Sequence, residues 1–146
     1  MVETITTLVL TVGSGLLLCY WFRYTCLLVL SAKTTRDYAG EMARANGLSF
    51  LQVQAELRTA SVGDLSKLHQ ALDRDYEIVS GLLTRCGDLN PEDRLLKFNY
   101  QVTRAFAKSV GSLSPTAARR ALDEMAMVVA HFADTMGERA AMGAAA

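Results

Sequence analysis

The chain has 146 residues with 15 basic and 15 acidic side chains, and its formal net charge at pH 7 is zero. This balance gives no electrostatic basis for binding DNA or RNA, so we expect no nucleic-acid partner. About 110 residues follow the apolar N-terminal segment, which is enough for one domain with its own core and too few for two.

The N-terminal segment 4–22 carries no charged residue, and all 15 basic residues lie at Arg23 or later. A helix of this length rises about 28 Å, close to the roughly 30 Å thickness of a bilayer core. The side chains that follow suit the headgroup zone, where aromatic rings and guanidinium groups anchor a span. They are Tyr20, Trp21, Arg23 and Tyr24. We therefore predict an all-α fold with an anchor over residues 1–33, whose transmembrane helix leaves the lipid near Tyr24.

The charges that flank the span predict its orientation. Arg23, Lys33 and Arg36 follow it, whereas Glu3 precedes it. Basic residues near the end of a span favour the cytoplasmic side. We expect a single-pass protein of the cell (inner) membrane, with the N-terminus outside and the C-terminal domain in the cytoplasm.

Two other interpretations of this segment compete. A cleaved secretory signal would need a basic start, a shorter apolar stretch and small residues at a cleavage site, and residues 30–32 meet that pattern poorly. A span continuing through 26–30 would place Arg23 in lipid, at a cost of a few kcal/mol. We favour a helix that continues beyond the membrane, with an apolar stretch covered by headgroups, by its own domain or by a partner subunit. The contact residues predicted there are Leu27, Leu28 and Leu30.

Small residues recur on one face of the span. Thr7, Thr11, Gly15 and Cys19 are spaced by four, and Ser14 lies next to Gly15 on the helix surface. Helices in lipid associate through close backbone approach over small residues, with hydroxyl groups bonding across. This small-residue ridge predicts pairing with another transmembrane protein or with a second copy. The alternative is that small residues are simply frequent in spans.

Capping patterns divide the rest of the chain into five helical segments. Ser or Thr followed three residues later by an acid or amide marks a helix start, as does a capping residue before proline. The residues that mark these starts are Thr34, Ser49, Ser61, Asn90 and Ser114. The helices expected from these patterns cover about 35–46, 49–60, 64–86, 91–110 and 115–140.

No segment alternates with a period of two, and the linkers are short, so neighbouring helices are expected to be antiparallel. We predict two short connecting helices in 34–62 and an antiparallel three-helix bundle in 63–140. The Ala-rich tail 141–146 is expected to fray.

Apolar residues recur at steps of three and four in the last three segments, which is typical of core stripes. The first stripe is Leu65, Leu68, Leu72, Tyr76, Val79, Leu83 and Cys86. The second stripe is Leu95, Phe98, Val102, Phe106 and Val110. The third stripe is Ala118, Leu122, Met125, Val129, Phe132 and Met136. Further alanines broaden the third apolar arc, so that helix is either central in the bundle, which we favour, or keeps a face for a partner.

The two histidines are candidate metal ligands. His69 shares a helix face with Asp73 and Glu77, and Glu124 lies seven residues before His131. Two carboxylates and two imidazoles could hold a metal across a bundle. The Glu-x-x-His pairs of carboxylate di-metal bundles are absent, however, and His69 beside Asp73 is typical of a surface pair. We therefore predict no metal site.

Other chemical motifs are also missing. Cys19, Cys26 and Cys86 form no Cys-x-x-Cys pair, which excludes the common zinc, iron–sulfur and haem-attachment spacings. The chain contains neither a Gly-x-Ser-x-Gly elbow nor a phosphate-binding loop. We predict no catalytic residue and no cofactor, and the sequence identifies no small-molecule substrate.

These observations favour a non-catalytic interaction protein: an anchored helical subunit or adaptor of a larger membrane assembly. One alternative is a regulatory or sensory module in which the short helices 35–60 transmit a change between membrane and bundle. Another is an enzyme or electron-carrying subunit that uses His69 or His131.

Overall fold

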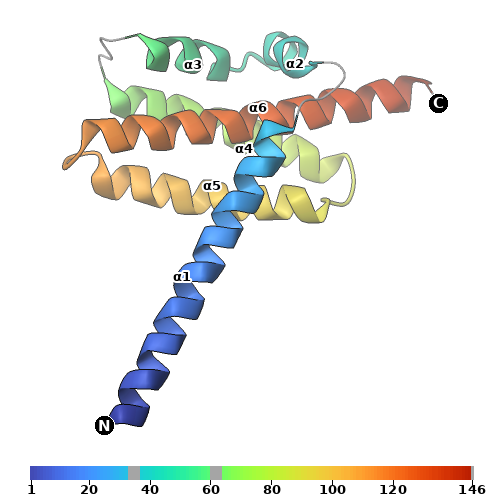
Figure 1. Ribbon diagram of the computed structural model, residues 1–146. Coiled ribbons are helices and arrows are strands. Elements are labelled where there is room, and N and C mark those ends of the chain that lie inside the picture. Colours follow the sequence, from blue (N-terminus) through green and yellow to red (C-terminus); the bar gives the residue numbers. More distant parts are fainter. Residues whose placement is uncertain (33–36, 60–63, 146) are drawn as a thin grey trace. The chain divides into compact units, whose positions relative to one another are not determined.

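The computed structural model describes residues 1–32, 37–59 and 64–145, which form six helices and no strand (Figure 1). The prediction of an all-α fold is confirmed for this part of the chain. Its helices are α1 (Val2–Ser31), α2 (Ala39–Asn46), α3 (Phe50–Arg58), α4 (Leu65–Arg85), α5 (Pro91–Val110) and α6 (Pro115–Ala145). They form two compact units, with α1 in the first and the other five helices in the second.

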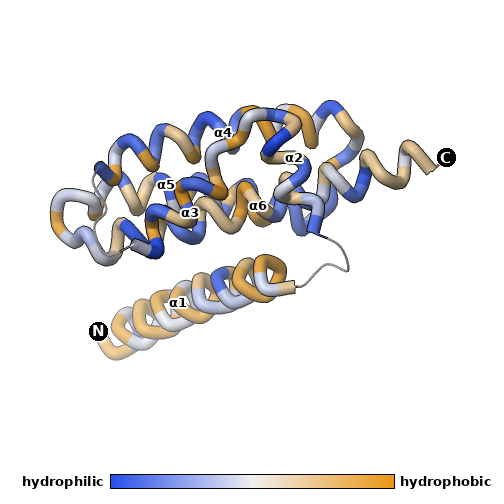
Figure 2. Tube along the Cα trace, turned by 90° about the horizontal axis from the view of Figure 1, so that it is seen from above, coloured by the Kyte–Doolittle hydropathy of each residue, from blue (hydrophilic) through white to orange (hydrophobic). Residues whose placement is uncertain are grey.

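The first unit is a continuous helix of 30 residues that passes Tyr24 without a break. Apolar residues dominate its length, as Figure 2 shows. Among the described helices it is the one long and apolar enough to cross a membrane, and its most apolar 18-residue window is not buried. Length and composition therefore allow α1 to span a bilayer.

Helix α6 is the centre of the second unit. It contacts α2, α3, α4 and α5. Helices α2 and α3 lie along one side of α6, and α5 lies along the opposite side (Figure 1). The prediction that this helix is the central one is confirmed, and its broad apolar arc follows from having neighbours on several sides.

The core stripes predicted for α4 and α6 are largely confirmed. All six predicted positions of α6 are buried, as are Leu68, Leu72, Val79 and Leu83 of α4. Cys86 was predicted to be in the core and is exposed. The helix ends at Arg85, so Cys86 is the C-cap residue and no longer follows the helical face.

The stripe predicted for α5 is wrong. Phe98, Val102 and Phe106 are 61%, 44% and 50% exposed, and Leu95 and Val110 are only partly covered. A different face is buried, made of Asp93, Leu96, Asn99, Tyr100, Thr103 and Ala107.

The reason for this reversal is that polar groups on the buried face of α5 have partners. Asn99 donates from Nδ2 to Glu124 Oε1 over 2.7 Å, and the Tyr100 hydroxyl donates to Asp73 over 3.0 Å. Buried polar groups that are hydrogen-bonded lose much of their desolvation penalty. Apolar periodicity alone cannot detect such compensation, because it counts apolar side chains only.

Most helix limits agree with the capping patterns. The limits of α5 match the predicted 91–110, and Gly47, with φ of 62°, ends α2 in the left-handed conformation that favours glycine. Helix α6 extends to Ala145, beyond the predicted end at 140, since alanine is a strong helix former. The predicted starts at Thr34 and Ser61 lie outside the described residues.

Two predicted side-chain caps are wrong. Neither Ser49 nor Asn90 caps its own helix through its side chain. Instead Asp75 of α4 accepts a hydrogen bond at Oδ2 from the backbone N–H of Ser49, over 2.7 Å. In the same way Asp134 of α6 accepts from the backbone N–H of Tyr38, over 2.7 Å, at the start of α2. Both short helices thus receive an N-terminal cap from a distant aspartate.

The C-terminus of α3 is also held from another helix. Arg119 of α6 donates from Nη2 to the carbonyl oxygens of Leu57 and Thr59, both over 2.8 Å. A carboxylate at the N-terminus and a guanidinium at the C-terminus match the charge of the helix dipole. Helix α3 is therefore capped at both ends by long helices.

Glycine allows close packing where α2 begins. A Cβ added at Gly137 of α6 would overlap the Cβ of Tyr38. Gly137 is buried, and Asp134 on the same helix binds the Tyr38 backbone. The glycine and the carboxylate together position the start of α2 against α6.

We expect Asp75→Ala to lower the free energy of unfolding by about 1–3 kcal/mol, because it leaves the Ser49 N–H without an acceptor in a buried site. Asp64→Ala is the matched control, since Asp64 caps α4 by accepting from Ser66 at an exposed position. Its loss should cost about 1 kcal/mol. Thermal unfolding in mild detergent, followed by circular dichroism, would measure both, and equal losses would contradict a special role for the buried cap.

We expect Gly137→Ala to lower the free energy of unfolding by about 1–3 kcal/mol, because the new methyl group displaces Tyr38. Gly81→Ala is the control: it lies within α4, where an added Cβ meets nothing within 4 Å. That change should stabilise the helix by about 1 kcal/mol. The same unfolding measurement checks both variants, and stabilisation by Gly137→Ala would show that Tyr38 moves without cost.

Candidate functional site

The small-residue ridge predicted on α1 lies on an exposed helix surface. All of its members are exposed: Thr7, Thr11, Ser14, Gly15 and Cys19. The hydroxyl groups of Thr7 and Thr11 donate to the carbonyl oxygens of Glu3 and Thr7, each over 2.8 Å, which leaves their oxygens as acceptors. A Cβ added at Gly15 would meet nothing within 4 Å. The ridge therefore has room for a second helix, and its use in pairing stays a prediction.

The predicted interfacial residues lie close together along the same helix. Tyr20 and Tyr24 stack with their ring centroids 6.3 Å apart, and Trp21 meets Tyr24 edge-on at 6.0 Å. These three rings are 45–65% exposed. Arg23 lies between them in the chain. The group has the composition of an aromatic belt, whose placement in a headgroup zone stays a prediction.

The three leucines predicted to contact a partner outside the bilayer lie in the last two turns of α1. Leu27 and Leu28 are 45% and 51% exposed, and Leu30 is partly covered. Such side chains can pack against apolar groups of lipid or protein. Their contact with a partner stays a prediction.

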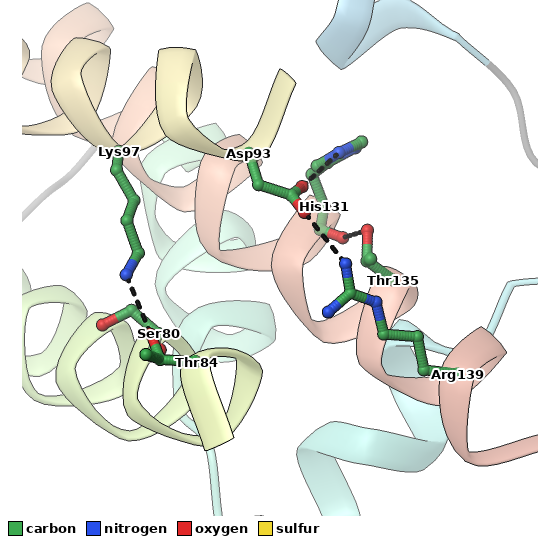
Figure 3. Close-up of polar contacts among 7 residues, drawn as sticks. All are labelled: Ser80, Thr84, Asp93, Lys97, His131, Thr135 and Arg139. Atoms are coloured by element: carbon green, nitrogen blue, oxygen red, sulfur yellow. Dashed lines mark hydrogen bonds and ion pairs between the residues drawn. The ribbon is translucent and has the colours of Figure 1, made fainter. Parts of the chain in front are cut away.

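The structure separates Glu124 from His131 and gives each its own contact. Glu124 accepts from Asn99, whereas His131 Nε2 lies 4.0 Å from Asp93 Oδ1. Arg139 Nη2 also lies 3.3 Å from Asp93 Oδ2 (Figure 3). Asp93 is buried, so its charge is balanced by a cation from α6. This cluster joins α5 to α6.

A second polar cluster joins α4 to α5. The Asp73 carboxylate accepts from the Tyr100 hydroxyl and from Arg104 Nε, each over 3.0 Å. His69 Nε2 lies 3.4 Å from the same carboxylate. The Tyr100 ring stacks on Tyr76 with centroids 3.8 Å apart. Glu77, predicted to share a face with His69 and Asp73, is exposed and takes no part in these contacts.

His69 and Asp73 line a pocket of about 440 Å³ at one end of the second unit. Helix α5 contributes Ala107 and Lys108 to the pocket, and α6 contributes Leu122. The pocket thus combines an imidazole, a carboxylate and an amine with apolar walls, which is the composition of many small-molecule sites.

The electrostatics of His69 favour a neutral ring. Desolvation by burial lowers the pKa of His69, the nearby cations Lys108 and Arg104 lower it further, and Asp73 opposes them. Its Nε2 atom is buried without a hydrogen-bond partner among the described residues. A neutral imidazole is a possible proton acceptor, but general-base chemistry also needs a nucleophile or substrate within hydrogen-bond reach. The Asp73 carboxylate lies 3.4 Å from Nε2 without forming a hydrogen bond to it.

No group of three or more His, Cys, Asp and Glu side chains that could hold a metal occurs in the described ranges.

Three further buried acidic or amide side chains were not anticipated as structural residues. They are Asp75, Asp134 and Asn99. Asp75 had a detectable signal, because it falls between Leu72 and Val79 on the apolar stripe of α4.

Comparison with known proteins gives no family assignment: no protein-family model, no curated protein and no solved structure matches this chain.

We expect His69 to titrate below its ordinary pKa of 6.5. The unfolded chain then takes up a proton at this side chain before the folded chain does. The free energy of unfolding should therefore fall as the pH decreases below 6.5, until the folded-state pKa is reached. NMR of the imidazole signals would measure the pKa. Comparing His69→Gln with wild type at pH 7.5 and pH 5 would measure the stability change. A titration midpoint at or above 6.5 in the NMR measurement would contradict the lowered pKa.

Proposed function

We propose that this protein is a single-pass, membrane-anchored interaction protein: a non-catalytic accessory subunit or adaptor whose helical domain belongs to a larger membrane assembly. The observation that carries the proposal is the uncovered apolar surface of α1. Its 30 residues exceed the length needed to cross a bilayer. Exposed leucine and valine side chains along this helix favour a lipid or protein environment over water.

Charge supports the proposed orientation. The positive side chains Arg23, Lys33 and Arg36 follow the apolar segment, and Glu3 precedes it. We therefore place the N-terminus outside and the helical domain in the cytoplasm, in the cell (inner) membrane.

The proposed partner in the bilayer is another transmembrane helix, from a second copy or from a different protein. The small-residue ridge supports this, because Gly15 leaves space for close backbone approach. Ridges of this composition pair helices through van der Waals contact, without needing a hydrophobic drive.

Gly15→Leu tests the function. The larger side chain fills the groove and should reduce co-purification of the partner, while membrane insertion stays intact. The measurement is a mild-detergent pull-down of the tagged full-length chain from its native membrane, with mass spectrometry of the associated proteins. Gly13→Leu is the matched control, since it makes the same change on the opposite helix face and should leave association unchanged. Equal recovery from both variants would remove the ridge from the pairing.

A further inference from the structure

The exposed face of α5 combines an apolar row with a basic row. Phe98, Val102 and Phe106 are spaced by four residues, so they lie on one face of the helix. Their exposures of 61%, 44% and 50% are high for large apolar side chains in one contiguous row. We call these three residues the α5 apolar row. A contiguous apolar row on the surface indicates an interaction site more strongly than scattered apolar residues do.

Beyond its first turn, which holds Glu92 and Asp93, α5 carries only basic charges. Residues 94–110 contain four basic side chains and no Asp or Glu: Arg94, Lys97, Arg104 and Lys108. Arg104 is balanced by Asp73 at 3.0 Å. Lys97 Nζ donates to the uncharged Thr84 hydroxyl over 3.1 Å (Figure 3), and Arg94 and Lys108 are exposed. Three of the four charges thus remain without a neutralising carboxylate in these contacts.

Helical spacing places the basic charges beside the apolar row. Arg94 is four residues before Phe98 and continues the line of the row by one turn. Lys97, Arg104 and Lys108 are spaced by seven and four residues, so they form a second row along one side of the α5 apolar row. An apolar row with basic residues along its flank is the pattern of helices that lie in the surface of an anionic bilayer. There the rings enter the headgroup and acyl boundary while Lys and Arg meet the phosphates.

We propose that the exposed face of α5 docks on the surface of an anionic lipid bilayer. This inference rests on the proposed membrane anchor. Tethering by α1 would keep the domain at a high effective concentration near the headgroups, so a weak surface attraction is sufficient. Anionic lipid is favoured over a neutral protein surface because α5 beyond its first turn carries basic side chains and no Asp or Glu.

A single indole in the α5 apolar row tests the docking. The full chain carrying Trp21→Phe and Phe106→Trp would be reconstituted in bilayers that contain brominated phosphatidylglycerol, whose bromines quench indole fluorescence on contact. We expect quenching of the indole at position 106. The matched control carries Trp21→Phe and Leu51→Trp, since Leu51 of α3 is 44% exposed and lies on a different helix. Its indole should not be quenched.

Charge removal gives a second measure of the same contact. Adding Arg94→Gln or Lys108→Gln should reduce the ratio of docked to undocked domain about fivefold each, as expected for a basic residue near an anionic surface. Docking should also be weaker in bilayers of phosphatidylcholine alone. Equal docking in both kinds of bilayer would contradict a role for charge. Unchanged docking in both charge variants would contradict it as well.

Four outcomes overturn the proposal. Equal quenching at positions 106 and 51 shows that α5 has no preferred contact with lipid. Protection of position 106 from aqueous iodide without quenching by bromine shows that protein covers the face. Release of the chain from the membrane by alkaline carbonate rejects the proposed anchor together with the docking. A chain that stays in the membrane but has an unquenched indole at position 106 rejects only the docking and leaves the proposed function intact.

Discussion

Buried carboxylates hold the short helices to the long ones, and the rest of the second unit is arranged around these contacts. A helix of nine residues such as α3 is marginal in isolation. Asp75 supplies its N-terminal acceptor and Arg119 its C-terminal donor, so two neighbouring helices provide the caps that α3 lacks itself. Burial raises the pKa of Asp75, while hydrogen bonds from the Ser49 and Phe50 backbone lower it. The backbone N–H groups of α3 therefore stabilise the charged form of Asp75, which burial alone would disfavour.

Polar groups also decide which face of α5 is buried. The Asn99 amide, the Tyr100 hydroxyl and the Asp93 carboxylate all find partners on α4 or α6. This network links the three long helices and turns Phe98, Val102 and Phe106 outward. The hydrogen bonds and the ion pair of the buried face of α5 thus determine that its aromatic side chains are exposed. The packing of the domain therefore sets the surface that it presents to lipid or protein.

Sequence patterns predicted most helix limits, because a proline at a helix start and a glycine at a helix end act through the local backbone. Helix α5 matches its predicted limits, and the stripe of α6 is buried throughout, since a central helix needs apolar residues on most sides. The α5 stripe failed because two faces of that helix have helical spacing, and only the tertiary partners of Asn99 and Tyr100 decide between them. The caps at Ser49 and Tyr38 were missed for the same reason: their acceptors lie on other helices. The pairing of α1 depends on a second molecule, which one sequence cannot describe.

The order of synthesis gives the distant caps a further consequence. Asp75 follows Ser49 by 26 residues, Arg119 follows Leu57 by 62, and Asp134 follows Tyr38 by 96. Helices α2 and α3 are therefore synthesised before the side chains that cap them. The apolar helix α1 is made earlier still, so under the proposed function it would be available for insertion while the domain behind it is incomplete. Maturation of the domain then waits for α6, the last of these helices to be made.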